Sequence, residues 1–161
     1  MKILIVDDNA DIKCIGIIAE CKVRNIDIDI AKASKEALFK IYSEEGKTID
    51  GIILDMNMPM YPQCKAIQRE GENVLKNLSH RKINIPVLIF SDEEIEGEYE
   101  QVLGHMKDWD KEKNKFFDFL ERLPEERKKR EELQKLQKQK EEEEKGKQKK
   151  KKSRNIRKRN N

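Results

Sequence analysis

The sequence contains no long apolar run. None of its 161 residues lies in an apolar stretch of about 18, the length that a membrane-spanning helix requires. The first apolar run, Ile3–Val6, is followed at once by Asp7 and Asp8, whereas a secretory signal needs a longer apolar run behind positive charge. We therefore expect a cytoplasmic protein without a membrane span.

Cysteine is also scarce. Cys14, Cys21 and Cys64 are an odd number and include no C-x-x-C pair, which argues against a disulfide framework and against a zinc site. Cys14 and Cys21 are spaced so that they share one face of a helix. We expect both to pack in the core, because a free cysteine behaves as a small apolar side chain.

Apolar residues make up only 36% of the chain and charged residues 42%, against about 45–50% and about 25% in ordinary globular chains. Residues 125–161 hold 17 Lys and Arg against 8 Glu, a net charge of +9, and since the whole chain carries +3, the residues before them carry −6. We predict a folded domain over residues 1–123 and a charged tail over 124–161. The tail should be partly helical to Lys145 and disordered beyond it, because it has little apolar surface.

Strand patterns alternate with helix patterns through the first 123 residues. Such an alternation predicts βαβ units and a parallel sheet. Within the first helix Ile12, Ile15, Ile18 and Ala19 stand at helical spacing, and Ser34 is a candidate N-cap of the second helix. The predicted strands are Lys2–Val6, 26–30, Ile49–Leu54, Ile83–Phe90 and Gln101–Met106, and the predicted helices are Asp11–Val23, 34–45, Gly71–Leu78 and Trp109–Leu123.

Polar side chains follow three of these strands: Asp7 and Asp8, Asp55, and Ser91. In parallel sheets a ligand binds beyond the carboxyl ends of the strands. Three carboxylates that meet there repel one another and either take up protons or hold a cation, and a few carboxylates plus water suit Mg²⁺ best. One carboxylate could then attack a phosphoryl group, with the Ser91 hydroxyl donating to the phosphate. The alternative for Asp7 and Asp8 is a helix start, which also favours acids.

These segments resemble a known family. The stretches ILIVDDN (3–9), SKEALFKI (34–41), DGIILDMNMP (50–59) and IPVLIFS (85–91) are similar, in this order, to the receiver domain of bacterial response regulators. The resemblance covers about residues 1–122. It implies a flavodoxin-like, doubly wound α/β fold with five parallel strands in the order 2-1-3-4-5.

The resemblance also implies a site. A histidine kinase would transfer phosphate to Asp55, with Mg²⁺ held by Asp55, by Asp8 directly, by Asp7 through water and by the backbone carbonyl of Asn57. Ser91 would supply the hydroxyl that follows the phosphate when the domain switches. The protein would be a switch and not an enzyme, catalysing at most its own phosphorylation and dephosphorylation.

The chain departs from the family pattern at two loops. The segment between Pro59 and Gly71 is longer than the family usually shows. The segment after Ser91 is short and acidic, so we expect the helix between the fourth and fifth strands to be short or absent. That helix belongs to the family's output face, and partner recognition is therefore expected to be altered.

A third departure concerns the lysine that ends the last strand in the family. Lys107 is nearest to that place, but Asp108 follows it where the family has proline. Lys111, or no lysine, are the alternatives. Losing this lysine would weaken phosphate-coupled switching while leaving the metal-binding acids intact.

The leading hypothesis is a stand-alone receiver that signals through contact with a downstream protein, and a dimer is compatible with the sequence. The alternative is a receiver-like adaptor that no longer needs phosphate. The tail Lys145–Arg159 could bind nucleic acid or another anionic surface by releasing counterions, without base stacking because it has no aromatic residue. A solubilising tail, or one that folds back onto the acidic domain, are the other interpretations.

Overall fold

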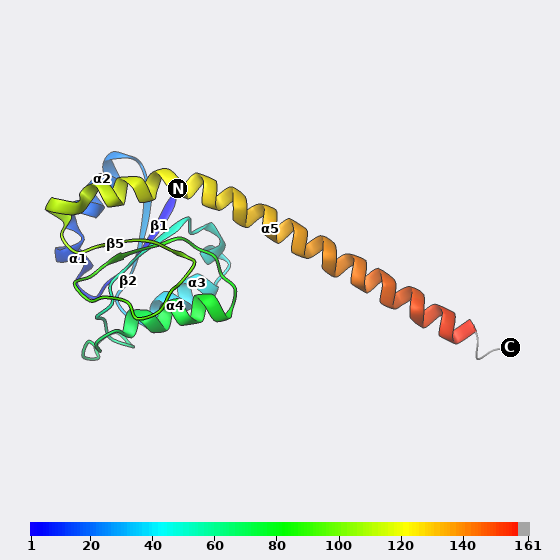
Figure 1. Cartoon of the computed structure of the whole chain (residues 1–161). Helices are drawn as coiled ribbons and strands as arrows, with labels where there is room; N and C mark the ends of the chain where they lie inside the picture. Colours follow the sequence, from blue (N-terminus) through cyan, green and yellow to red (C-terminus); the bar gives the residue numbers. More distant parts are fainter. Residues whose placement is uncertain (158–161) are drawn as a thin grey trace. The chain divides into compact units, whose positions relative to one another are not determined.

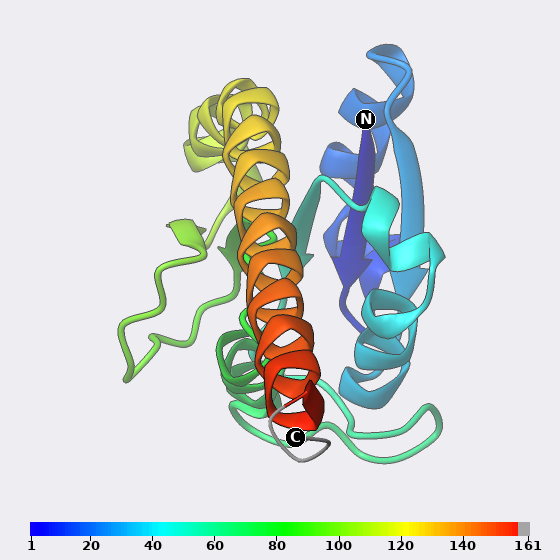
Figure 2. The same cartoon turned by 90° about the vertical axis from the view of Figure 1, so that its right-hand side faces the viewer.

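The five predicted strands form one parallel sheet. In the computed structural model they pair in the order β2-β1-β3-β4-β5, and helices lie on both faces of the sheet (Figures 1 and 2). The strands are β1 (Lys2–Val6), β2 (Asp27–Ala31), β3 (Gly51–Leu54), β4 (Val87–Phe90) and β5 (Val102–Met106). This is the flavodoxin-like α/β fold predicted from the sequence. The structure describes the backbone of residues 1–157 and the side chains of residues 1–140 and 145.

The sheet is covered by two layers of helices. These are α1 (Ala10–Lys13), α2 (Ile15–Val23), α3 (Ser34–Tyr42), α4 (Glu70–His80) and α5 (Trp109–Arg157), with a short 3₁₀ helix at Glu45–Thr48. Because side chains alternate along a strand, Leu4 and Val6 of β1 pack with α3 and α4 in one core. Ile3 and Ile5 pack in the other core with α1, α2 and the first turns of α5.

The predicted helix Asp11–Val23 is two helices that part at Cys14, whose backbone φ of −98° and ψ of 16° leave the helical range. Cys14 and Cys21 are buried, which confirms the expectation that they pack in the core. Two of the residues at helical spacing do not face the core, because the side chains of Ile12 and Ile15 are 78% and 67% exposed. Apolar residues lie around most of this segment, so their spacing did not determine which face meets the sheet.

The long loop after β3 is fixed at both ends. Met58 and Ile67 form an antiparallel bridge, with the Ile67 N–H donating to the Met58 carbonyl over 3.0 Å. The first amides of α3, those of Ser34 and Lys35, donate to the carbonyls of Pro59 and Met60. The extra residues thus leave and re-enter the fold at defined points.

The prediction that Ser34 caps α3 is wrong. Ala33 holds the N-cap position, and the Ser34 hydroxyl donates to Glu70 Oε1 over 2.6 Å in a buried contact. The loop carbonyls already satisfy the first amides of α3, so the hydroxyl is free to join α3 to α4. A serine before a helix pattern cannot reveal such a competing partner.

No helix lies between β4 and β5, as the sequence predicted. The connecting segment is held instead by Glu72 of α4, a buried carboxylate. Glu72 Oε1 accepts the backbone N–H of Glu96 at 2.8 Å and the Arg69 guanidinium at 2.6 Å. Arg69 also pairs with the Glu96 carboxylate. The start of α4 therefore anchors the segment that takes the place of a helix.

Helix α5 continues where the sequence predicted that the fold would end. It runs through Pro124 to Arg157, although proline removes one helical hydrogen bond. The Glu-, Lys- and Gln-rich residues that follow have high helix propensity. Residues up to Glu126 belong to the domain, and those from Arg127 form a separate unit. Most side chains of the predicted anion-binding segment Lys145–Arg159 lie outside the described residues.

Within the part of the chain that the structure describes, no helix combines the length and apolar character that crossing a membrane would demand.

The Glu72 contacts predict a pH dependence of stability. The Glu96 N–H and the Arg69 guanidinium lower the pKa of Glu72 below its ordinary value of 4.5. The unfolded state therefore takes up the proton first, so this stabilisation is present above pH 4.5 and is lost as the pH falls through the folded-state pKa. We expect Glu72→Gln to lower the free energy of unfolding at pH 7 by about 2 kcal/mol and to flatten its acid limb, measured by urea unfolding at several pH values.

Glu44→Gln is the matched control. Glu44 makes the same kind of i,i+3 ion pair, with Lys47 at 2.6 Å, but both side chains are exposed. Its loss should change the free energy of unfolding by less than about 0.5 kcal/mol. Equal effects of the two variants would contradict the role given to Glu72.

Gly71 allows α4 to begin against the backbone that follows β3. A Cβ atom added there would lie 2.3 Å from the Asp55 carbonyl oxygen and 2.9 Å from Met56 Cα. We expect Gly71→Ala to lower the free energy of unfolding by about 2 kcal/mol despite the helix propensity of alanine, because backbone must shift. Gly104→Ala is the control, since its Cβ would meet only the end of the Leu88 side chain at 3.1 Å. Urea unfolding measures both, and a Gly71→Ala protein as stable as Gly104→Ala would refute this explanation.

Candidate functional site

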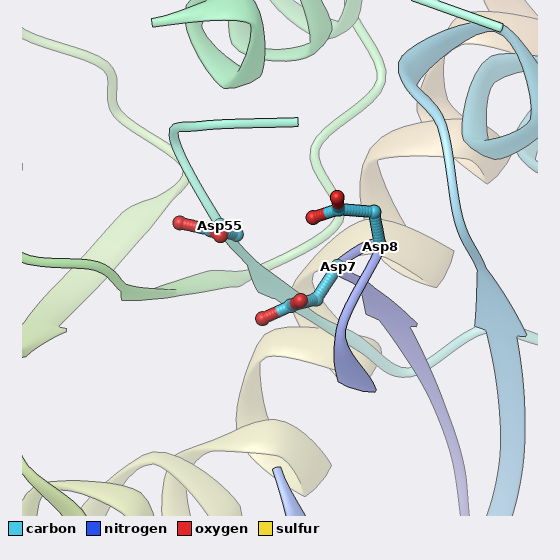
Figure 3. Close-up of side chains that lie close together, drawn as sticks. All are labelled: Asp7, Asp8 and Asp55. Atoms are coloured by element: carbon cyan, nitrogen blue, oxygen red, sulfur yellow. The ribbon is translucent and has the colours of Figure 1, made fainter. Parts of the chain in front are cut away.

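The three acids predicted from the sequence meet at the carboxyl edge of the sheet. Asp7, Asp8 and Asp55 each offer a carboxylate oxygen, and these oxygens all lie within 4.8 Å of one another. Figure 3 shows Asp7 and Asp8 at the end of β1 and Asp55 at the end of β3. Neighbouring strand ends thus bring together residues that are far apart in the sequence.

The sheet ladder itself positions the two buried acids. The Asp7 N–H donates to the Ala31 carbonyl at the end of β2, and the Asp55 N–H donates to the Val6 carbonyl at the end of β1. These bonds extend the ladder by one residue beyond each strand. The side chains of Asp7 and Asp55 are only 2% and 7% exposed, whereas Asp8 is half-buried.

A lysine that the sequence analysis did not select lies at this cluster. Lys13 Nζ, at the end of α1, is 3.0 Å from Asp55 Oδ2 and 3.7 Å from Asp7 Oδ2. The same ammonium lies 5.4 Å from the centre of the Phe90 ring. The signal that could have found Lys13 is its place in the first helix after the acidic pair, because that helix starts at the edge where the acids meet.

The remaining oxygens of the buried acids are held by backbone amides. Asp7 Oδ1 accepts the Asn9 N–H at 2.7 Å, and Asp55 Oδ1 accepts the Asn57 N–H at 3.3 Å. Burial raises the pKa of Asp7, against the Asn9 bond and Lys13, which lower it, and the neighbouring Asp55 and Asp8 raise it further. Asp7 is therefore a carboxylate that gains from an additional positive charge nearby.

Burial also raises the pKa of the Cys14 thiol, and the charge of Asp7 raises it further. Cys14 Sγ lies 3.8 Å from Asp7 Oδ2. A thiol kept protonated in this way is a poor nucleophile and a poor metal ligand. Cys14 is thus part of the wall of the site.

Asn57 and the loop after it close another side of the site. The Asn57 side-chain oxygen accepts the Arg69 N–H at 3.0 Å, and Arg69 adopts a left-handed φ of 64°. The Gly71 N–H donates to the Met56 carbonyl at 3.0 Å. The backbone after Asp55 is therefore held against the start of α4, as a fixed cation site requires.

Ser91 follows β4 and is buried, with 1% of its surface exposed. Its N–H donates to the Met106 carbonyl at 3.1 Å, and its hydroxyl accepts the Glu93 N–H at 3.4 Å. His105 Nε2 donates to the Ser91 carbonyl at 2.6 Å. These bonds fix the serine backbone at the strand end, where the sequence predicted it.

Lys107 pairs with a different acid. Its Nζ is 2.5 Å from Glu94 Oε1, an ion pair that raises the pKa of Lys107 and lowers the pKa of Glu94. Lys111, the alternative, pairs with Asp108 at 2.9 Å. Among the described residues, Lys13 is the one whose cationic group lies within 4 Å of the Asp55 carboxylate.

The donor set fits Mg²⁺. Three carboxylates supply only oxygen, which this hard cation prefers, and they leave room for the waters that Mg²⁺ usually retains. Among the described residues no histidine or available thiol joins the group, so a site for zinc or another softer metal is not favoured.

Comparison with known proteins gave solved structures only: no protein-family model matches the chain, and no curated protein matches it. The receiver domain of a Francisella response regulator is 32% identical over 59% of this chain and 69% of that one, with a TM-score of 0.45. A CheY-like receiver protein from Methanospirillum hungatei is 18% identical, with a TM-score of 0.59 over 80% of this chain and 97% of that one. TrrA from Thermotoga maritima, solved in complex with Mg²⁺ and BeF, is 23% identical, with a TM-score of 0.51 over 73% of this chain and 97% of that one.

The fold, the acid cluster and these similarities agree. The sheet order is 2-1-3-4-5, three acids meet at the strand ends, and solved structures with a similar fold include receiver domains and a response regulator. The chain belongs to the receiver-domain family of response regulators.

Proposed function

We propose that the protein is a phosphoacceptor switch of a two-component system, which accepts a phosphoryl group on Asp55 from a histidine kinase and signals through contact with another protein. The meeting of Asp7, Asp8 and Asp55 at one edge of the sheet carries this proposal. A structural role alone does not explain why three acids share this edge, because like charges at such distances destabilise the fold and the single ammonium of Lys13 cannot neutralise all three.

The proposed chemistry is a displacement at phosphorus. An oxygen of the Asp55 carboxylate forms a new P–O bond while the P–N bond to the donor histidine breaks, and the imidazole nitrogen keeps the electron pair. The product is an acyl phosphate. The buried setting of Asp55 limits the access of water that would hydrolyse it.

Asp8, Asp55, the backbone carbonyl of Asn57 and, through water, Asp7 are the proposed holders of Mg²⁺. When bound, the metal would neutralise the charge on the transferring oxygens. The residues of the chain supply the position: the ladder bonds of Asp7 and Asp55 and the Asn57 amide fix where the carboxylates stand. The Mg²⁺ and BeF complex of TrrA supports the same class of ligand for this chain.

Ser91 is the proposed switching hydroxyl. Its weak 3.4 Å contact with the Glu93 N–H leaves the hydroxyl proton able to turn toward a phosphate. The segment after Ser91 is tied to α4 through Glu72 and Arg69. A change at Ser91 would thus reach the surface where the family helix is missing, and a downstream protein is expected to read that surface.

A phosphate-independent adaptor is the second candidate. The observation that favours it is the ion pair between Lys107 and Glu94, because it directs this lysine to an acid other than Asp55. An adaptor would bind its partner equally with Asp55→Asn, so a pull-down that compares this variant with the wild type separates the two functions.

Phosphorylation of Asp55 can be tested directly. Incubation of the full chain with acetyl phosphate and Mg²⁺ should add the mass of one phosphoryl group, and Asp55→Asn should abolish the addition. Asp50→Asn is the control, because Asp50 is a buried acid at the opposite end of β3. No added mass in the wild type, or mass that persists in Asp55→Asn, would contradict the proposal.

Removal of one acid should also reveal the metal. Without divalent cations, we expect Asp7→Asn to raise the free energy of unfolding by about 1 kcal/mol, because the buried repulsion falls. Mg²⁺ should raise the melting temperature of the wild type and raise that of Asp7→Asn less, measured by thermal unfolding. Asp11→Asn, which alters an exposed acid paired with Lys32, should respond to Mg²⁺ as the wild type does. A wild type indifferent to Mg²⁺ would refute the metal site.

A further inference from the structure

The acceptor carboxylate already has a cationic partner. Lys13 Nζ lies 3.0 Å from Asp55 Oδ2, the oxygen opposite to the one that accepts the Asn57 N–H. The two oxygens of Asp55 thus have different partners, one a backbone amide and one an ammonium. Any negative charge added at Asp55 would develop beside this ammonium.

Lys13 is held in this place by the fold. Its N–H donates to the Asn9 carbonyl at 2.9 Å, so that α1 starts directly after the acidic pair. The ammonium lies over the Phe90 ring of β4 at 5.4 Å and is also 3.7 Å from Asp7 Oδ2. With 31% of the side chain exposed, Lys13 keeps enough freedom to stay beside a group that grows out from Asp55.

Lys107 is the lysine nearest to the place where the family has its lysine, but it forms an ion pair with a different acid. Its ammonium is paired with Glu94 at 2.5 Å, and its backbone N–H donates to Glu112. That N–H and Lys115 lower the pKa of Glu112 to about 2, so Glu112 is ionised at neutral pH and continues to accept the bond from Lys107. Moving Lys107 to Asp55 would break the pair with Glu94, whereas Lys13 is already in contact.

We propose that Lys13, and not Lys107, supplies the ammonium that neutralises the phosphoryl group on Asp55. This inference rests on the proposed phosphoacceptor function. With acetyl phosphate as donor, an Asp55 oxygen forms the new P–O bond, the P–O bond to acetate breaks, and acetate leaves with the electron pair. No proton is transferred, so Lys13 acts only through its charge and its N–H donors.

The same ammonium can offset the negative charge before and after the phosphoryl transfer, so a single lysine on α1 is enough. Before transfer, Lys13 offsets the charge of the Asp55 carboxylate. After transfer, Asp55 is an acyl phosphate and the negative charge resides on the phosphoryl oxygens, beside the same ammonium. The charge-assisted hydrogen bond is thus exchanged from a carboxylate to a phosphate, and both acceptors suit an ammonium.

The test compares rates of phosphorylation of the full chain by acetyl phosphate and Mg²⁺, followed by intact mass. We expect Lys13→Gln to lower the rate about tenfold or more, the size expected for one charge-assisted hydrogen bond in the transition state. Lys13→Arg, which keeps a cation at the site, should recover most of the rate. Lys40→Gln is the matched control, because Lys40 forms an ion pair with Asp29 at similar exposure, 28%, on α3, and it should react as the wild type does.

A second measurement distinguishes the loss of the Lys13 charge from a general loss of folding. Lys13→Gln should bind Mg²⁺ at least as tightly as the wild type by calorimetry, since the lysine repels a cation at the acids. A loss of rate with intact Mg²⁺ binding therefore assigns the effect to the phosphoryl group.

Two results would overturn the inference, and they are distinguishable from failure of the function itself. One is a wild-type rate in Lys13→Gln, and the other is a larger loss in Lys107→Gln than in Lys13→Gln. Either result leaves Asp55 as the acceptor. If the wild type takes no phosphoryl group at all, both the function and the role of Lys13 fall together.

Discussion

Repulsion among three carboxylates at one edge of the sheet is the constraint on which the rest of the structure depends. Asp7 and Asp55 are buried and cannot be separated, because ladder hydrogen bonds to β2 and β1 fix their backbones. The fold offsets the repulsion with two backbone amides and the ammonium of Lys13. Three carboxylates can accept more hydrogen bonds than these partners donate. The site is therefore stable enough to fold and still favours an added cation.

The same constraint explains the architecture around the site. The side of the site formed by the loop after β3 is held at short range: Gly71 lies against the Asp55 carbonyl, and the Arg69 N–H donates to the Asn57 side chain. Arg69 then reaches Glu72 and Glu96 with its side chain. One residue thus contacts the loop beside Asp55 and the segment that replaces the family helix. The two departures from the family pattern, which look unrelated in the sequence, meet at Arg69.

The fold and the acid cluster could be predicted from the sequence, because both depend on local patterns. Apolar runs mark the strands, and the acids stand directly after them, so that parallel pairing brings Asp7, Asp8 and Asp55 together. The partner of Ser34 could not be predicted, since it depends on which face of a helix meets the sheet, whereas the place of Lys13 in the first helix after the acids could have indicated that it lies near them. Around α1 and α2 the apolar residues do not single out one face, and the exposure of Ile12 and Ile15 follows from packing. The length of α5 was missed because proline was given more weight than the helix-forming residues after it.

The anchoring of the loop after β3 has a consequence for how this chain could have diverged. The bridge between Met58 and Ile67 and the bonds from Ser34 and Lys35 to Pro59 and Met60 hold both stems of the loop. Residues can be gained or lost between these stems without moving Asp55, because loop closure depends only weakly on length. The length of the loop and the geometry around Asp55 are then free to evolve separately. A lineage could reshape this surface for a new partner while the site beneath it stays the same.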